Sequence, residues 1–524
     1  MSKSLKSIGV VSFLTVVSRV LALLRDSLAF AIFGSGWLYS AFLAAFMLPN
    51  LFRRLLAEGS MTAAFVPTLQ EELQANGREG TFRLLSKVTS WLLVVTGALV
   101  LAAAALFSQS RRLPGHEEKW YMAADLTVLL FPYLGLISLA AACSAALNVH
   151  RHFVEPALSP VWLNLCMIAA LAGAGLHFAR TPLGEVHWLC AGVLAGGVLQ
   201  LAVPAGVLVS MGWRPALDLG LSPRVREIAL LMTPGIFGTA IYQINFTVSR
   251  LLAFWIDDSS NTYLYTVNRL MEFPIGVFAV AVSTVVYPLI AAHAAKRDFA
   301  AMSTDFQRGI RLILVINVPA AVGLALISGP LIRLIYQHGH GTAADSQRMS
   351  LLLALMVIGL PFFSVVNLTI RAFYAVKDTR TPVRVALVDF LINATLSLVL
   401  ARWLGVIGIV IASTTSIIAQ TLLLGRALVR RLPEVHLGPL VPSLAKVAAS
   451  SAAMAVVVAV GLRLVPLAGL GARGADLASV AVLVPAGVAA YGLVLWRLRI
   501  EGRDEIEALL VRLPLAGRFF ARVL

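Results

Sequence analysis

An apolar segment whose only charged residue is Lys87 decides the class of fold: SKVTSWLLVVTGALVLAAAALFS, residues 86–108. As a helix, about twenty apolar residues cross a hydrocarbon core of roughly 30 Å, so this segment is long enough to span a membrane. Similar segments recur along the whole chain, which is 59% hydrophobic and only 13% charged. Since a soluble domain has roughly 25% charged residues, the composition excludes a soluble multidomain protein.

Proline, glycine and charged residues divide the chain into about fourteen apolar spans. We therefore predict an all-α polytopic membrane protein with about fourteen transmembrane helices. The first span carries charges and lacks a cleavage site, so we expect a retained helix and not a signal peptide. The second and eighth spans are longer than a bilayer and each contains two prolines, which predicts bends. The spans cover approximately residues 7–33, 38–70, 86–108, 121–148, 156–178, 187–211, 226–256, 262–292, 306–328, 347–374, 382–402, 406–425, 443–464 and 475–496.

The distribution of positive charge predicts the topology. An even number of spans places both termini on one side, and Lys and Arg are concentrated in the loops of that side and in the C-terminal tail. Such an excess is typical of cytoplasmic loops, so we expect both termini in the cytoplasm. The net charge of +16 then reflects topology and attraction to anionic membrane lipids, and it does not indicate nucleic-acid binding.

A weak internal repeat links the first six spans to the next six. Phe131-Pro132-Tyr133 resembles Leu360-Pro361-Phe362, and Pro156 and Pro382 follow at similar distances. The segment AAFVP, residues 63–67, likewise resembles TVVYP, residues 284–288. Six spans are an even number, so the two copies share one orientation, and we expect a pseudo-two-fold axis along the membrane normal. The predicted parts are an N-lobe (1–221), a C-lobe (222–435), two extra helices (436–498) and a basic cytoplasmic tail (499–524).

Charged residues inside the spans are the strongest candidates for function. A charge at the centre of a bilayer costs roughly 2.5–3.5 kcal/mol on insertion scales, so such residues usually face a cavity. Ion pairing between helices is the alternative explanation, but six arginines outnumber four acids. Since guanidinium is always charged and matches phosphate geometry, the surplus predicts a site for a phosphate or pyrophosphate. The arginines are Arg19, Arg25, Arg53, Arg54, Arg250 and Arg269, and the acids are Asp26, Glu58, Glu272 and Asp389.

Other chemistry has weaker support in the sequence. We find no phosphate-binding loop of the Walker type and no metal-ligand or catalytic-triad spacing, so we expect a non-enzyme without a metal or cofactor. Asp389 and Asn393 lie four residues apart on one helix face and could hold a cation together with Asn245 and Ser249. Hydrogen-bonded helix packing is the favoured explanation for these four residues. The three cysteines lie in apolar spans and predict no disulfide.

Several of these segments resemble a known family. They are SRVL (18–21) followed by Arg25-Asp26, LPNLFRRLLAEG (48–59), NRLMEFP (268–274), and RAFY (371–374) followed by DTRTP (378–382). They resemble the MurJ (MviN) lipid II flippases of the multidrug/oligosaccharidyl-lipid/polysaccharide exporter superfamily. The resemblance covers essentially the whole chain, and the second and third segments are its most specific parts.

The resemblance implies export of undecaprenyl-pyrophosphate-linked peptidoglycan precursor, lipid II, across the bacterial cytoplasmic membrane by alternating access. It implies that the arginines at 19, 25, 53, 54 and 269 line the central cavity, with Arg25 and Arg269 nearest the pyrophosphate. Asp26, Glu58, Arg250 and Glu272 would be their charge partners, and the two extra helices would form a groove for the lipid tail. Ser40 and Ser249 stand where many relatives have Asp, which puts a sodium site at Ser249 in doubt.

The resemblance leaves some questions of function open. Coupling to Na⁺ or H⁺, a monomeric state and contact with the cell-wall synthesis machinery are expectations only. A flippase for another polyprenyl-linked glycan, a cation-coupled drug exporter of the same superfamily and a non-transporting scaffold are the alternatives. A cavity for cationic drugs should be acidic, and a scaffold would leave the intramembrane charge without a purpose.

Overall fold

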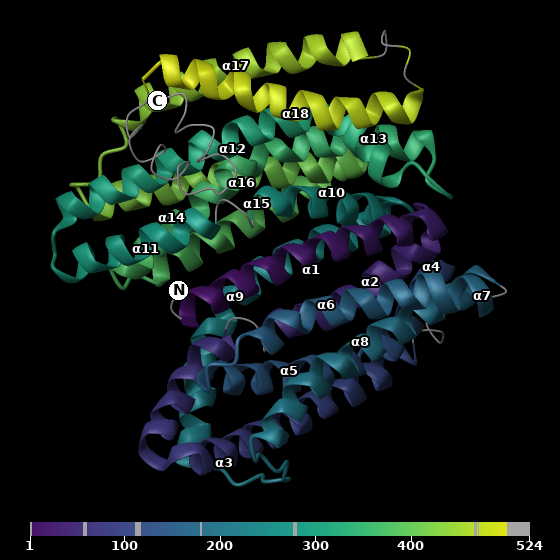
Figure 1. The fold of residues 1–524 in the computed structure, drawn as a ribbon, viewed down its shortest axis with the longest axis vertical. Helices are drawn as coiled ribbons and strands as arrows, with labels where there is room; N and C mark the ends of the chain where they lie inside the picture. Colours follow the sequence, from purple (N-terminus) through teal and green to yellow (C-terminus); the bar gives the residue numbers. More distant parts are fainter. Residues whose placement is uncertain are drawn as a thin grey trace. The chain divides into compact units, whose positions relative to one another are not determined.

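The structure is a computed structural model that describes residues 3–55, 60–109, 117–178, 181–275, 280–465, 469 and 471–499. In this part of the chain all regular secondary structure is helical, as predicted (Figure 1). The elements are α1 (Lys3–Phe33), α2 (Trp37–Arg53), α3 (Ser60–Phe107), α4 (Glu118–Leu130), α5 (Pro132–Val149), α6 (Val154–Ala169), a π-helical turn (Ala170–Gly175), α7 (Leu176–Phe178), α8 (Pro182–Ser210), α9 (Pro223–Ile256), α10 (Ser260–Pro274), α11 (Val280–Ala295), α12 (Phe299–Tyr336), α13 (Ala343–Met356), a 3-10 turn (Val357–Gly359), α14 (Leu360–Ala375), α15 (Arg380–Leu404), α16 (Val406–Arg431), α17 (Leu440–Leu464) and α18 (Ala472–Arg497).

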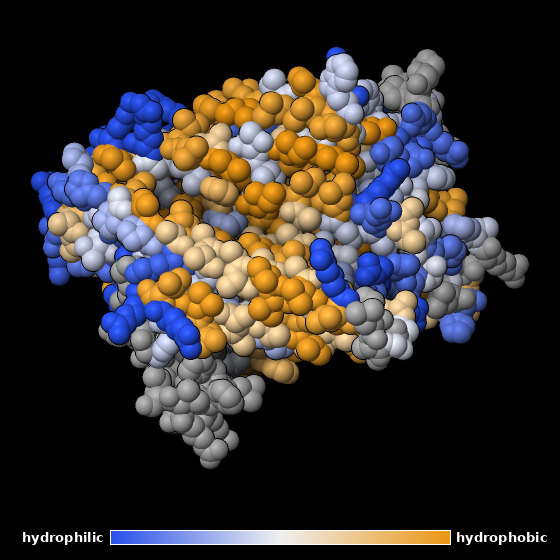
Figure 2. Space-filling view, turned by 90° about the horizontal axis from the view of Figure 1, so that it is seen from above, coloured by the Kyte–Doolittle hydropathy of each residue, from blue (hydrophilic) through white to orange (hydrophobic). Residues whose placement is uncertain are grey.

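Ten helical segments of the described chain are long and apolar enough to cross a membrane. The predicted count of about fourteen is therefore not established by length and composition. The helices α1, α2, α9 and α10 fall outside this set, and they carry most of the intramembrane charges singled out above. On the face shown in Figure 2, hydrophobic side chains gather between hydrophilic margins, as expected of a protein that lies in lipid.

The chain forms two compact units. The first contains Met1–Thr266 and His338–Thr342, and the second contains Val267–Gln337 and Ala343–Leu524. The predicted lobes are defined by the internal repeat, whereas these units are defined by compactness. The compact units therefore do not test the lobe boundaries, which stay a prediction.

The two spans predicted to bend are each two helices. Residues 38–70 contain the end of α2 at Arg53 and the start of α3 at Ser60, and residues 262–292 contain the end of α10 at Pro274 and the start of α11 at Val280. Pro274 stands at the end of α10, where the missing backbone donor favours a break, whereas Pro49, Pro67 and Pro288 lie inside α2, α3 and α11. The segments between these helices include residues 56–59 and 276–279, which lie outside the described part.

The helix breaks recur at positions matched by the repeat. Between α4 and α5 the helix is interrupted at Phe131, directly before Pro132, and between α13 and α14 it tightens at Val357–Gly359, just before Pro361. Each of the two helices that follow is succeeded, two positions after its last residue, by a basic residue with positive φ, Arg151 or Lys377. These local similarities support the predicted repeat.

Each unit has its own core. In the first unit Tyr39, Phe42 and Phe46 of α2 stack one above the other, and Phe46 packs against Tyr133 of α5. In the second unit α12 is the longest helix and packs against α11, α14, α17 and α18. Figure 1 shows α17 and α18 side by side.

Two polar contacts hold α18 on α12. Arg333 and Asp476 form an ion pair with an Nη2–Oδ1 distance of 2.5 Å, and the hydroxyl of Tyr491 donates to the carbonyl of Val315 at 2.7 Å. The extra helices are therefore integral to the second unit.

Candidate functional site

Arg25 of α1 is the centre of a buried polar cluster in the first unit. Arg25 is only 4% exposed, and Asp26 is 3% exposed. The guanidinium Nη2 lies 2.6 Å from Oδ1 of Asp26, and Nε donates to the same oxygen at 3.0 Å. Nη1 donates to Oδ1 of Asn164 on α6 at 2.9 Å, and Nη2 donates to the hydroxyl of Tyr265 on α10 at 3.0 Å. A charge this deeply buried is tolerated only with such a set of partners.

Tyr265 contacts both members of this ion pair. Its hydroxyl also donates to Oδ1 of Asp26 at 3.1 Å, while it accepts from Arg25. In this conformation the positive charge of Arg25 is neutralised by Asp26. An incoming anion must therefore replace the carboxylate of Asp26, the hydroxyl of Tyr265, or both.

Arg250 of α9 lies in a second buried position of the same unit. Its Nε donates to Oδ1 of Asn261 at 2.9 Å, and Asn261 in turn donates from Nδ2 to the backbone carbonyl of Ser40 at 2.9 Å. The guanidinium also lies over the ring of Tyr265, with Cζ 5.1 Å from the centroid. Ser40, where the resemblance implies an Asp in many relatives, is fully buried in the interior of the unit.

Arg53 and Arg54, at the end of α2, are half-buried. Arg53 Nε donates to Oδ1 of Asn50 at 3.1 Å, one turn earlier, and Arg54 Nη1 donates to Oε1 of Gln243 on α9 at 3.4 Å. Arg19 lies half-buried on α1. Glu58, predicted as their charge partner, lies outside the described residues.

Arg269 and Glu272 form the predicted ion pair in the second unit. Nη1 of Arg269 lies 3.2 Å from Oε2 of Glu272, and the side chains are 32% and 47% exposed. Ion pairing therefore accounts for part of the intramembrane charge, which is the alternative explanation given in the sequence analysis. Since the arginines at 19, 25, 53, 54 and 250 belong to the first unit and Arg269 to the second, their convergence on one cavity stays a prediction.

The four residues of the predicted cation site also belong to two different units. Asn245 and Ser249 are half-buried on α9 of the first unit, and Asp389 and Asn393 are buried on α15 of the second. The amide oxygen Oδ1 of Asn393 accepts from the hydroxyls of Ser397 and Ser413, both at 3.3 Å. The bond from Ser413 links α15 to α16, which favours a packing role for Asn393.

Four contact residues of the arginines were not predicted from the sequence: Asn164, Gln243, Asn261 and Tyr265. Asn164 is a single polar residue in an apolar stretch, whereas Asn261 and Tyr265 stand among other polar residues of α10. An amide in an apolar span must find a hydrogen-bond partner, so isolation was an available signal for Asn164 alone.

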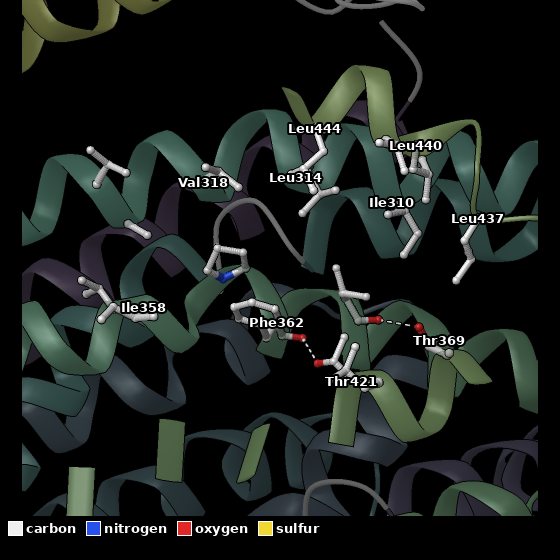
Figure 3. A pocket seen from close by; sticks show the side chains of 18 of the residues that line it. Ile310, Leu314, Val318, Ile358, Phe362, Thr369, Thr421, Leu437, Leu440 and Leu444 are labelled. Atoms are coloured by element: carbon white, nitrogen blue, oxygen red, sulfur yellow. Dashed lines mark hydrogen bonds between the residues drawn. The ribbon is translucent and has the colours of Figure 1, made fainter. Parts of the chain in front are cut away.

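The second unit also contains an apolar cavity of about 770 Å³ (Figure 3). Its walls come from α12, the 3-10 turn before α14, α14, α16, α17 and the segment before α17, and Arg426 is the one charged residue among the described residues that line it. Thr421 donates to the carbonyl of Phe362 at 3.4 Å, so its hydroxyl is already bonded within the wall. The residues labelled in Figure 3 are Ile310, Leu314, Val318, Ile358, Phe362, Thr369, Thr421, Leu437, Leu440 and Leu444.

This cavity overlaps only part of the predicted tail groove. It includes α17, the first extra helix, whereas no lining residue comes from α18. A groove formed by both extra helices stays a prediction.

Comparison with known proteins gives consistent matches. A family model described as lipid II flippase MurJ matches residues 30–470. The chain is 34% identical over 415 residues to a probable lipid II flippase MurJ of Rhizobium tropici, covering 77% of this chain and 76% of the relative. It is 32% identical over 441 residues to a probable lipid II flippase MurJ of Haemophilus influenzae, covering 80% and 84%.

Solved structures match over a similar extent. The lipid II flippase MurJ in an inward closed conformation matches with a TM-score of 0.76 and 25% identity, covering 95% of this chain and 99% of that chain. An inward-facing multidrug resistance transporter of the MATE family matches with a TM-score of 0.59 and 13% identity, covering 81% and 95%. The second likeness shows a shared fold alone.

Proposed function

The chain belongs to the MurJ family of lipid II flippases, multi-pass proteins of the bacterial inner membrane, and we propose that its buried arginines bind the pyrophosphate of lipid II during transport. The observation that carries this proposal is the cluster around Arg25. Arg25 is a buried guanidinium with a fork geometry suited to phosphate, and its ion-pair partner is on the same helix.

On this proposal the pyrophosphate exchanges with Asp26. Asp26 has one negative charge, whereas pyrophosphate carries about two, so exchange strengthens the attraction to Arg25 once both anions are equally desolvated. Asn164 and Tyr265 then keep the guanidinium oriented or donate to the phosphate themselves. Arg19, Arg53, Arg54 and Arg269 are the further binding residues of the proposal, with Arg250 as a charge partner.

The lipid tail needs an apolar surface on which to bind. The cavity between α12, α14, α16 and α17 supports this role, because its walls are almost entirely apolar and polyprenyl chains bind by burial of apolar surface. We propose that part of the undecaprenyl chain occupies it.

The proposed transport cycle is based on the predicted lobes and on the substrate charge. We propose that the protein alternates between inward-open and outward-open states with both termini in the cytoplasm. One charge crossing the membrane potential gains roughly 2.3 kcal/mol per 100 mV, so a pyrophosphate with about two charges gains about 4–5 kcal/mol on export. Since this gain favours export without a coupling ion, we propose that the membrane potential drives the cycle, with Na⁺ or H⁺ coupling through Asp389 and Asn393 as the second candidate.

The test is replacement of an essential flippase in a bacterial host by variants of this chain. Arg25→Ala and Arg269→Ala should insert in the membrane but fail to support growth, and Lys should restore little because it lacks the bidentate fork. Arg83→Ala is the matched control, since the side chain of Arg83 is 77% exposed and forms an ion pair with Glu79 on the surface. Normal growth of cells with Arg25→Ala, or loss of growth with Arg83→Ala alone, would contradict the assignment.

A further inference from the structure

Basic residues occupy strained backbone positions at four helix ends. Among the described residues, the non-glycine residues with positive φ are Arg151 (64°), Arg297 (58°), Lys377 (60°) and Arg499 (47°). They follow α5, α11, α14 and α18, each two positions beyond the last helical residue. In this conformation the Cβ atom of an L-residue lies too close to the following carbonyl oxygen, and glycine is the usual residue.

The hydrogen bonds are those of ordinary helix caps. The N–H of Asp378 donates to the carbonyl of Phe373 at 2.9 Å, and the N–H of Lys377 donates to that of Tyr374 at 3.0 Å. The same pattern recurs after α5, where the N–H of His152 donates to Leu147 at 2.9 Å. These bonds use only backbone atoms, so a glycine would make them equally well.

Glycine takes such a position elsewhere in the chain. Gly77 (φ 65°) lies ten residues after Pro67, and Arg297 lies nine residues after Pro288, the two prolines matched by the repeat. The first copy thus uses glycine where the second uses arginine. The fold alone therefore does not require a basic residue at this turn.

In the predicted topology the four basic cap residues all lie on the cytoplasmic side. All four basic caps follow spans that end in the cytoplasm. The positive-φ residues at helix ends or loops on the predicted periplasmic side are glycines, namely Gly34, Gly339, Gly405 and Gly469. On the cytoplasmic side Gly77 and Gly212 show that glycine is also accepted there.

The four side chains are available to a ligand. All four residues are exposed, and within the described part of the chain none of them takes part in an ion pair. A helix C-terminus favours a nearby cation, but Arg430 and Arg431 provide one at the end of α16 without positive φ. The strained caps therefore need a further reason.

We propose that Arg151, Arg297 and Lys377 bind the phosphate groups of anionic phospholipids in the cytoplasmic leaflet, at the point where each helix leaves the membrane. The cytoplasmic leaflet is negatively charged, and a basic residue in the cap is placed directly at the headgroup level. Each contact is local to one helix end and holds that end at a fixed depth. The inference uses the cytoplasmic topology of the proposed function but not its substrate.

The experiment compares lipid binding by the full-length chain and a triple glycine variant, R151G/R297G/K377G. Protein in neutral detergent is titrated with phosphatidylglycerol or phosphatidylcholine, and bound lipid is counted by native mass spectrometry while the thermal midpoint Tm is recorded. The glycine variant should keep or raise its Tm without lipid, because strain is relieved. Its binding of phosphatidylglycerol should weaken about fivefold for each charge removed.

Three controls make the outcome decisive. R151K/R297K/K377R keeps the charges and should bind like wild type, and Gly77→Arg should strengthen binding of phosphatidylglycerol. Soluble glycerol phosphate, which carries a phosphate but no acyl chains, should not raise Tm. Unchanged binding of phosphatidylglycerol by the glycine variant, a lower Tm of that variant without lipid, or an equal effect of glycerol phosphate would each overturn the proposal. Lipid II is absent from this assay, so a failure here is distinct from a failure of the proposed transport function.

Discussion

The ion pair between Arg25 and Asp26 should dominate the local stability of the first unit. The substitution Asp26→Asn removes the carboxylate that lies 2.6 Å from Nη2 of Arg25 and keeps the size of the side chain. Arg25, at 4% exposure, then keeps Asn164 and Tyr265 as partners but loses its counter-charge. Breaking a buried pair in this way costs about 3–5 kcal/mol, because an uncompensated charge is left in the interior.

A pair of comparable chemistry in the second unit provides the control. Arg269 and Glu272 are three residues apart on α10, and their side chains are 32% and 47% exposed. Exposed pairs at this spacing contribute about 0.5 kcal/mol or less, so Glu272→Gln should change the free energy of unfolding little. The double variant Arg25→Met/Asp26→Asn should be less destabilised than Asp26→Asn, since both buried charges are removed together.

Thermal unfolding in detergent, followed by tryptophan fluorescence, measures these effects. The expected order of Tm is wild type close to Glu272→Gln, then the double variant, then Asp26→Asn. An Asp26→Asn protein as stable as wild type would show that the amides and Tyr265 alone compensate Arg25. The account of the cluster as a neutralised ion pair would then be wrong.

Three further outcomes are expected. Burial acts to raise the pKa of Asp378, but hydrogen bonds from Thr381 and Arg380 and the charge of Arg431 bring it below the ordinary 3.8 overall. This stabilisation is present above the ordinary pKa and is lost as the pH falls through the folded pKa. The deficit in Tm of Asp378→Asn should therefore shrink below pH 3.8, and a deficit that does not vary with pH would contradict this. Ala325→Trp fills part of the apolar cavity and should slow flipping of a long-chain substrate more than that of a short-chain analogue, while Leu101→Trp, at a site 72% exposed on α3, should have no effect on either. In proteoliposomes with potential and sodium gradient imposed separately, flipping should follow the potential, and flipping that follows sodium alone would favour the site at Asp389 and Asn393.

Much of the fold could be predicted because hydrocarbon imposes a simple rule. Every backbone group in lipid must be bonded within its own helix, so apolar length gives the helices and proline gives their breaks. The interruptions at Phe131 and before Pro361 were predictable for this reason. The count was harder, because α1 carries charges within its apolar stretch and α10 is only 15 residues long.

The partners of the site residues depend on contacts between distant segments. Asn164 and Tyr265 lie 139 and 240 positions from Arg25, and no local pattern links them. The ion pair of Arg333 and Asp476 likewise joins residues 143 positions apart. The sequence predicts that a buried arginine needs partners, but only the packing of the helices decides which polar residue supplies them.

The position of Tyr265 has a consequence for the proposed cycle. Tyr265 and Arg269 are four residues apart on α10, about one helical turn, and the boundary between the two compact units falls between them. On the proposed mechanism, the pyrophosphate reaches Arg25 only when the hydroxyl of Tyr265 or the carboxylate of Asp26 is displaced. A movement of α10 that withdraws Tyr265 also moves Arg269, because both are fixed to one rigid helix. On the proposed mechanism, release of Arg25 and displacement of Arg269 would then be a single event.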